Sequence, residues 1–234
     1  MAISTAVSRI ADFCGRHGFI ATLRRAGVGV KRALFSSRSI LFYCELPTLT
    51  APPPDLPGGV EVERKKSTAE LSPENFEAIT SFWSPKLAQR NMKERFAKGA
   101  SLWLIKSNSR LAGYGWTLAG RTVEPHYFPL GTGDVHLFDF HVFPQYRGQG
   151  MNPLLVCHIL SRVACEAASR AFIEAAEWNQ PQLSSLSKTP FRCLGQARKL
   201  TICGHTVVFW AEKNAVPTST KVPVRAIDNP ARGL

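Results

Sequence analysis

HVFPQYRGQGMNPLL, residues His141 to Leu155, places an arginine and two glycines directly between an apolar strand-like run and an apolar helix-like run. A strand that passes through a glycine turn into a helix leaves several backbone N–H groups unpaired at one point, with the positive end of the helix dipole behind them. Glycine also lets the backbone approach a ligand without a Cβ in between. The stretch therefore predicts an anion-binding turn, and the simpler alternative is a strand-to-helix turn in which glycine serves only the backbone geometry.

The composition is that of an ordinary soluble protein with a strong positive charge. The 234 residues are 44% hydrophobic and 20% charged, which is enough for one sizeable core. The net charge of +12 indicates attraction to polyanions such as nucleic acid, anionic lipid or phosphate-rich cofactors. No run reaches the ~18 apolar residues of a membrane span. The six cysteines form no C-x-x-C pair, so we expect reduced thiols in a cytoplasmic protein and no metal site.

Residues 1–50 are predicted to be a basic N-terminal arm. Apolar residues between Phe19 and Phe35 fall near one side of a helix, which favours an amphipathic helix in peripheral contact with anionic membrane at its inner face. A solvated extension, a helix packed on its own domain and a mitochondrial transit peptide remain alternatives. A short strand over Ser39 to Leu46 ends the arm. Nucleic acid is not the expected partner, because aliphatic residues interrupt the basic ones and no aromatic RNA-binding run appears.

The rest of the chain is predicted to be a Pro/Gly linker over 51–59, a compact domain over 60–212 and a disordered basic tail over 213–234. Strands are expected over 60–64, 101–106, 111–120, 135–142, 171–175, 198–203 and 206–211, and helices over 72–83, 86–97, 151–168 and 181–188. The strand over 135–142, the long helix and the strand over 171–175 form one parallel crossover. The order predicts an α+β fold with a mixed, mainly antiparallel central sheet of about six to seven strands and flanking helices.

QYRGQG, Gln145 to Gly150, matches the pattern [Q/R]-x-x-G-x-[G/A], and V-x-P precedes it at Val142 to Pro144. On these motifs the chain resembles the GNAT superfamily of N-acetyltransferases over roughly Val60 to Ala211, and in particular bacterial members with a basic N-terminal arm. The resemblance implies a sheet with a splayed parallel strand pair. It also implies acetyl-CoA, or another acyl-CoA, as the cofactor.

The resemblance further implies which residues hold the cofactor. The turn would bind the pyrophosphate, and the backbone of the preceding strand would bind the pantetheine arm and polarise the acyl carbonyl through a main-chain N–H. The cofactor-binding residues implied are Phe140, Val142, Gln145, Tyr146, Arg147, Gly148, Gln149, Gly150, Met151 and Asn179. The chain departs from the family seven residues after Asn179, where the tyrosine that often protonates the thiolate is replaced by Leu186, and Pro190 replaces a glycine.

Amine attack on a thioester needs a neutral amine, so a nearby carboxylate or histidine is expected to act as the base. Asp139 is the first candidate, Glu177 the second and His141 the third, and each has a purely structural alternative. No chemistry is predicted for His136, His158 or His205. The resemblance implies that 72–99 and 120–133 border the acceptor side, where Tyr114, Trp116, His126 and Tyr127 are expected to contact the substrate.

The predicted function is therefore an acyl-CoA-dependent N-acyltransferase that acts on a primary amine by direct attack in a ternary complex. Aromatic side chains of a cationic protein could stack on a sugar ring, which suggests an amino sugar or a small metabolite as the acceptor. The alternative is a catalytically weak GNAT-like binding module whose basic arm docks on anionic membrane or nucleic acid. The sequence does not indicate the acyl length or the oligomeric state.

Overall fold

The structure is a computed structural model that describes residues 38–48, 55–81, 84–123, 126–202 and 205–213. The predicted amphipathic helix between Phe19 and Phe35 and the predicted tail beyond Lys213 lie outside the described residues, as do residues 51–54 of the linker. Among the helices within these ranges, none combines the length and the apolar character that crossing a membrane requires.

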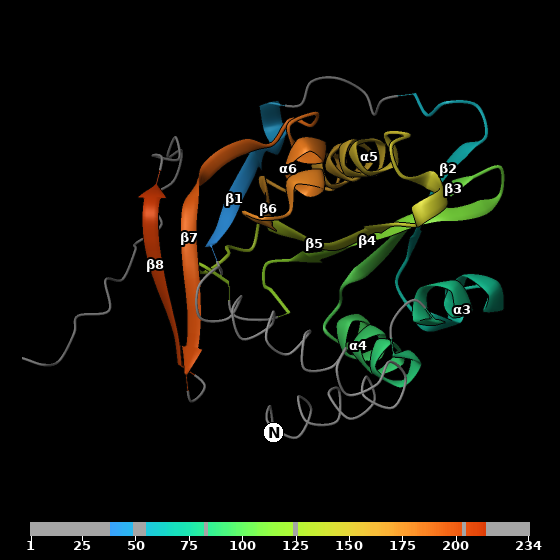
Figure 1. The fold of residues 1–234 in the computed structure, drawn as a ribbon, viewed down its shortest axis with the longest axis horizontal. Helices are drawn as coiled ribbons and strands as arrows, with labels where there is room; N and C mark the ends of the chain where they lie inside the picture. The colour runs from blue at the N-terminus through green and yellow to red at the C-terminus, as the bar shows by residue number, and fades with distance from the viewer. Residues whose placement is uncertain (1–37, 49–54, 82–83, 124–125, 203–204, 214–234) are drawn as a thin grey trace, which may run out of the picture.

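One eight-stranded sheet organises the chain, in the order β2-β3-β4-β5-β6-β1-β7-β8 (Figure 1). The pair β5 and β6 is parallel and the other neighbours are antiparallel, which confirms the predicted α+β fold with a mixed, mainly antiparallel sheet. The strands are β1 (Arg38–Glu45), β2 (Val60–Lys65), β3 (Ser101–Ser107), β4 (Arg110–Ala119), β5 (Asp134–Val142), β6 (Arg170–Ala176), β7 (Arg192–Ile202) and β8 (His205–Lys213).

Four α-helices flank this sheet in the described ranges: α3 (Pro73–Ser81), α4 (Pro85–Ala97), α5 (Met151–Cys165) and α6 (Gln180–Leu186). Short 3-10 turns occur at η1 (Leu46–Thr48), η2 (Thr68–Glu70) and η3 (Pro144–Tyr146). Each strand and helix predicted between residues 60 and 212 is present, although β7 begins at Arg192, six residues before its predicted start at Arg198. The period-2 and period-3.6 patterns of apolar residues were therefore sufficient to find these elements.

The position of β1 corrects the predicted domain boundary. β1 lies between β6 and β7 and is antiparallel to both, with Leu41 opposite Glu174 on one side and Gly195 on the other. The side chains of Leu41 and Tyr43 are 2% and 6% exposed. The strand therefore belongs to the folded domain rather than to a separate arm, and it raises the sheet to eight strands instead of six to seven.

The two faces of the sheet carry separate apolar clusters. On one face α5 and α6 pack over β3, β5 and β6, with Leu155, Ile159 and Val163 of α5 at most 3% exposed (Figure 1). On the other face α3 and α4 pack over β3 and β4 around Leu102, Leu104 and Met92 of the second cluster. Burying each such side chain stabilises the fold by about 1.5–3 kcal/mol, so α5 is held firmly against the sheet at the end of β5.

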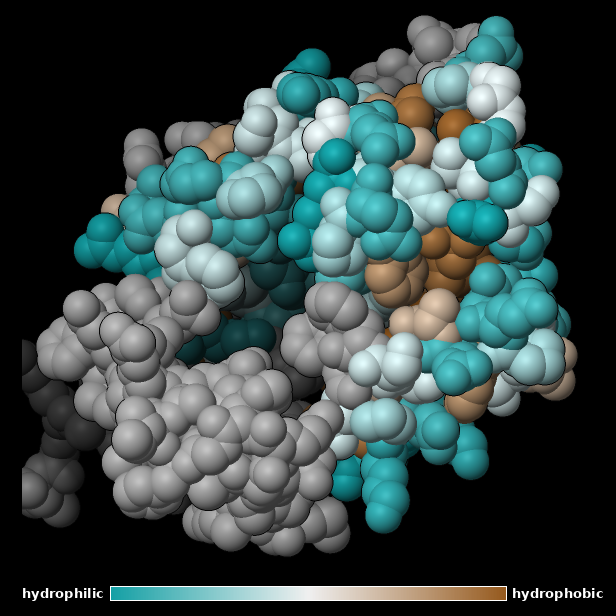
Figure 2. Space-filling model, turned by 45° about the vertical axis from the view of Figure 1, so that its right-hand side comes forward, coloured by the Kyte–Doolittle hydropathy of each residue, from teal (hydrophilic) through white to brown (hydrophobic). Residues whose placement is uncertain are grey.

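A third cluster covers the other half of the sheet, on the face opposite α5. It joins β1, β6 and β7 to the loop between β4 and β5, and its buried members are Leu41, Tyr43, Tyr127, Phe172, Leu194 and Ala197. On the face seen in Figure 2, hydrophilic residues make up most of the described surface and hydrophobic residues appear in small areas between them. The large hydrophobic side chains that are exposed include Trp178, Val207 and Phe209.

Candidate active site

The parallel strands β5 and β6 separate halfway along their length. Their ladder begins with Asp134 opposite Arg170 and ends with Leu137 opposite Ile173. Beyond that rung β5 continues to Val142 and β6 continues to Ala176. The two strands therefore leave main-chain groups turned toward a gap between them, which is the splayed pair that the resemblance implied.

A β-bulge sits at the start of this gap. Tyr114 pairs with His141 and Trp116 pairs with Phe138, so Asp139 and Phe140 of β5 stand opposite Gly115 alone. Asp139 has a φ of 51°, in the left-handed region, as the extra residue of a bulge can adopt. Gly115 leaves room for the Phe140 ring, because a Cβ there would lie 2.4 Å from an atom of that ring. The bulge thus redirects β5 where it parts from β6.

The main chain of β5 beyond the bulge faces the gap at alternate residues. Phe143 N donates to Ala112 O of β4 at 3.0 Å, whereas the carbonyl of Val142 is turned away from β4 and accepts from Arg147 Nε at 3.1 Å. Because backbone groups alternate in direction along a strand, Phe140 faces the same way as Val142. These are the two residues whose backbone was predicted to bind an extended cofactor arm.

The glycine turn that follows is open to solvent and rich in unpaired donors. Gly148 and Gly150 have φ values of 78° and 75°, and a Cβ on either would meet no atom within 4 Å. Within the part of the chain that the structure describes, the backbone N–H groups of residues 148–152 have no hydrogen-bond partner. They stand at the N-terminus of the 15-residue helix α5, whose dipole adds positive potential. This geometry suits an anion with several oxygens.

Side chains of the turn hold its shape. Gln149 Nε2 donates to Gln145 O at 3.0 Å, and Tyr146 packs against the cluster under α5. Met151 is 6% exposed and belongs to that cluster, so its backbone alone can face a ligand. Arg147, tied to Val142 by its Nε, keeps its positive charge beside the turn.

Asn179 has a local structural role. Its Oδ1 accepts from Gln182 N at 3.4 Å and caps α6. Asn152, which the sequence analysis did not single out, joins the two helices, because its Nδ2 donates to Ser185 Oγ at 2.7 Å and Gln182 Oε1 at 3.3 Å. Leu186, at the position of the family's tyrosine, is fully buried in the cluster under α5. That position therefore supplies no proton donor.

The three predicted bases lie in different surroundings. The Asp139 carboxylate accepts from Arg95 of α4, whose guanidinium lies 5.1 Å from the Trp116 ring centre. Glu177 is exposed in the turn after β6. His141 is half-buried with its ring 5.6 Å from Tyr114, and burial, with the charge of Arg147, lowers its pKa below the usual value while Asp139 opposes the shift. His141 is thus neutral near pH 7 and able to accept a proton.

The predicted substrate residues are mostly core residues. Tyr114 and Trp116 are 2% and 1% exposed, and they pack against α3 and α4. Tyr127 is buried in the third cluster, and His126 beside it is half-buried. Burial therefore excludes Tyr114 and Trp116 from direct contact with an acceptor in this structure. The prediction was wrong for these two residues because aromatic residues on the inner face of a strand have the same sequence pattern whether they line a pocket or fill a core.

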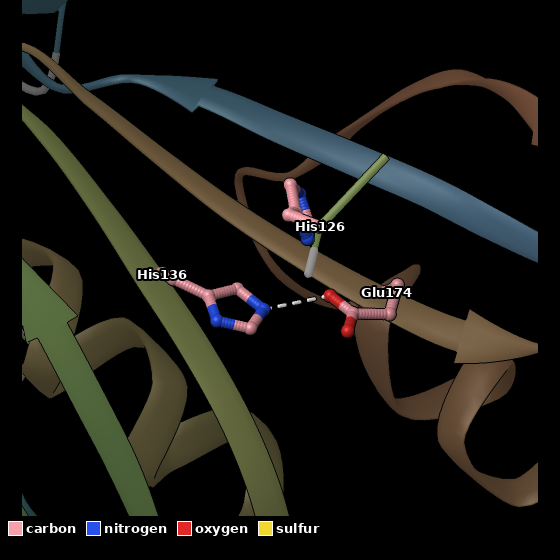
Figure 3. Close-up of side chains that lie close together, drawn as sticks. All are labelled: His126, His136 and Glu174. Atoms are coloured by element: carbon pink, nitrogen blue, oxygen red, sulfur yellow. Dashed lines mark hydrogen bonds and ion pairs between the residues drawn. The ribbon is translucent and has the colours of Figure 1, made fainter. Parts of the chain in front are cut away.

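A group of polar residues that the sequence analysis did not combine lies where the strands separate, on the face opposite α5. His136 Nε2 of β5 is 2.8 Å from Glu174 Oε2 of β6, and His126 lies beside them (Figure 3). Burial alone would raise the pKa of Glu174, but the hydrogen bond and charge of His136, with smaller contributions from His126 and Lys199, together lower that pKa. The strand register, which places His136 opposite Phe172 two residues before Glu174, brings them together.

The splayed parallel pair and the glycine turn before α5 form the arrangement that the resemblance implied, and the bulge is an additional feature that was not predicted. The fold is GNAT-like. No protein-family model matches the chain, and no curated protein is similar to it in sequence.

Solved structures of GNAT acetyltransferases are similar to this chain. One from Novosphingobium aromaticivorans shares 12% identity over 68% of this chain and 61% of its own, with a TM-score of 0.45. A GCN5-related N-acetyltransferase from Kribbella flavida shares 16% over 67% and 55%, with a TM-score of 0.42. A GNAT-family acetyltransferase from Colwellia psychrerythraea shares 14% over 76% and 59%, with a TM-score of 0.49. This chain thus spans less than two thirds of each of them, and similarity at this level carries no information on activity or substrate.

Proposed function

We propose that the protein is an acyl-CoA-dependent N-acyltransferase that transfers an acyl group, acetyl in the simplest case, to a primary amine. The observation that carries this proposal is the set of N–H groups of residues 148–152 that lack a hydrogen-bond partner in the described residues, at the N-terminus of α5, where a Cβ on Gly148 or Gly150 would meet no atom within 4 Å. A pyrophosphate would accept these hydrogen bonds. The main chain of Phe140 and Val142 would pair with the pantetheine arm like an added strand.

In this proposal the thioester lies at the bulge, and the amine approaches from the face opposite α5 in a ternary complex. The amine nitrogen forms a bond to the acyl carbon, the C–S bond breaks, and a main-chain N–H near Phe140 stabilises the charge on the carbonyl oxygen. We assign the role of base to His141 ahead of Asp139 and Glu177, because the imidazole is neutral near pH 7 and Asp139 is ion-paired with Arg95. Solvent protonates the thiolate, since Leu186 offers no donor. A small metabolite or an amino sugar would be the acceptor.

Acetyl-CoA binding by calorimetry tests the cofactor part of the proposal. Gly148→Glu places a carboxylate in the open space before α5 and is expected to abolish binding by the intact chain. Gly99→Glu is the matched control, because Gly99 is also exposed, has a φ of 83° and offers room for a Cβ, with its nearest neighbour 3.6 Å away. The control is expected to bind like the parent chain. Absence of binding by the parent chain, with acetyl-CoA and with longer acyl-CoA, would overturn the proposal.

The pH dependence of kcat/KM with an amine found by screening tests the base. With His141 as the base, kcat/KM rises as the pH increases through a value below the ordinary histidine pKa of about 6.5. His141→Gln is expected to lower kcat/KM by about 10²-fold or more and to remove this step. If His141→Gln showed the same rise of kcat/KM with pH, the general base would be Asp139 or Glu177 instead.

A further inference from the structure

His126, His136 and Glu174 come from three different elements and converge on one point. His126 lies in the loop between β4 and β5, His136 on β5 and Glu174 on β6 (Figure 3). One ligand atom from each lies within 4.8 Å of the others, and the closest pair is His136 Nε2 and Glu174 Oε2 at 2.8 Å. Imidazole nitrogens and a carboxylate oxygen are the donors that borderline transition metals prefer in proteins.

We infer that His126, His136 and Glu174 form a binding site for a divalent transition metal ion, with zinc as the best match. Three protein ligands around tetrahedral zinc leave a fourth position open. Ligand atoms around such an ion are about 3.3 Å apart, from Zn–N and Zn–O bonds of about 2.0–2.1 Å. The His136–Glu174 contact of 2.8 Å would therefore widen slightly, and ligand atoms that lie up to 4.8 Å apart would move closer together.

A buried nitrogen without a partner supports the site independently. His126 Nε2 is buried and has no hydrogen-bond partner in the described part of the chain. A buried polar atom without a partner is costly, and native structures contain few of them. A metal ion would satisfy this nitrogen.

His136 and Glu174 share one proton in this arrangement, because His136 Nε2 and Glu174 Oε2 form a hydrogen bond of 2.8 Å. A metal ion bound between them would take the place of that proton, so metal binding is expected to release it to solvent.

Aromatic side chains hold the rings in place. The His136 ring stacks on Phe138 at 5.2 Å, and the His126 ring lies 5.4 Å from Tyr127 and 5.0 Å from Phe128. Such a shell limits the access of water and strengthens charge interactions at the site. The ammonium group of Lys199 acts in the opposite direction, because it lies 5.3 Å from the Tyr127 ring centre and its positive charge reaches Glu174.

Zinc binding to the intact chain, freed of metal by a chelator, tests the inference, and this test is independent of any acyltransferase activity. Competition with a chromophoric zinc chelator is expected to show one zinc ion per chain. His126→Gln, His136→Gln and Glu174→Gln are each expected to weaken binding by about tenfold or more, whereas Lys199→Met is expected to strengthen it. His158→Gln is the matched control, because His158 Nδ1 is also buried without a partner in the described residues but lies on α5, on the opposite face of the sheet.

Thermal unfolding supplies a second readout, the change in Tm when zinc is added, which is compared within each variant and so does not depend on that variant's own stability. A ligand that binds the folded state raises its stability by RT ln(1 + [L]/Kd), so zinc should raise the Tm of the parent chain, and Ca²⁺ or Mg²⁺ should not. Glu174→Gln, which keeps an oxygen for the His136 hydrogen bond, should lose the zinc-dependent rise. Zinc binding that persists unchanged in all three ligand variants, or its absence in the parent chain, would overturn the inference.

Discussion

Asp134 and Arg170 stand opposite each other on the first rung of the parallel pair, and their side chains form a two-point ion pair. Arg170 Nε and Nη2 donate to the Asp134 carboxylate at 2.8 and 2.9 Å. Gly131 N donates to the same carboxylate at 2.8 Å. The Asp134 side chain is 3% exposed, so the ion pair fixes the first rung of the β5–β6 ladder, at the end opposite the splay.

Arg170→Met is expected to lower the free energy of unfolding by about 3–5 kcal/mol, because it leaves the Asp134 carboxylate buried without its counter-charge. Asp134→Asn combined with Arg170→Met should recover much of this loss, since no isolated charge remains. Urea unfolding of the parent chain, both single variants and the double variant gives the coupling energy. Equal destabilisation in the single and double variants would show that packing, not charge, matters at this rung.

Gly115→Ala tests the bulge. The new methyl group would lie 2.4 Å from an atom of the Phe140 ring, so the ring or the strand has to move. Such overpacking costs about 1–3 kcal/mol, measurable by urea unfolding, and acetyl-CoA affinity should fall with it because the backbone of Phe140 faces the gap. Gly58→Ala is the control, since a Cβ there meets nothing within 4 Å. A variant as stable as the parent chain would mean that the ring moves freely.

His158 is expected to make the protein less stable in mild acid. Burial, with the charge of Arg162, lowers its pKa in the folded state below the ordinary value of about 6.5. Between the lowered pKa of the folded state and the ordinary value of about 6.5, the unfolded chain binds a proton at His158 that the folded chain does not. The free energy of unfolding therefore falls as the pH drops from about 6.5 toward the folded-state pKa. His158→Gln should show a smaller decrease between pH 7 and pH 5 in urea unfolding. An identical pH dependence of stability in the parent chain and in His158→Gln would contradict this prediction.

The cysteines are expected to differ in reactivity. Cys44 is 3% exposed, and burial raises its pKa to about 11, with Arg192 opposing the shift and Cys157 and Glu45 adding to it. Cys165 is exposed at the end of α5. Because the thiolate is the reactive form, iodoacetamide at pH 8 should label Cys165 in the native protein and Cys44 only after denaturation. Peptide mapping by mass spectrometry gives the order, and equally fast labelling of Cys44 would show that β1 opens readily.

Local patterns in the sequence predicted much of the fold correctly. The alternation in 135–142, the spacing of Leu155, Ile159 and Val163, and the glycines at 148 and 150 each depend on a few neighbouring residues, and the structure has a strand, a helix and an open turn there. The proposed cofactor turn could be found in this way, because a strand, a glycine turn and a helix are contiguous in the chain.

Interactions between distant segments were missed for a corresponding reason. β1 reads as a strand from its sequence, but its place between β6 and β7 depends on hydrogen bonds to residues more than a hundred positions away. The burial of Tyr114 and Trp116 depends on α3 and α4 covering β4. The pairing of His136 with Glu174 depends on the register of a parallel ladder. None of these follows from spacing along the chain.

The sequence by itself determined the element order, the glycine turn and the polarity of each segment, because backbone dihedral preferences and apolar periodicity act within a few residues. The tertiary structure alone decided which strands are neighbours, where β5 and β6 part, and that His126, His136 and Glu174 share one point. These depend on strand register and on which faces become buried. Register and burial are properties of contacts between segments, and their free energy is gained only when the whole sheet assembles.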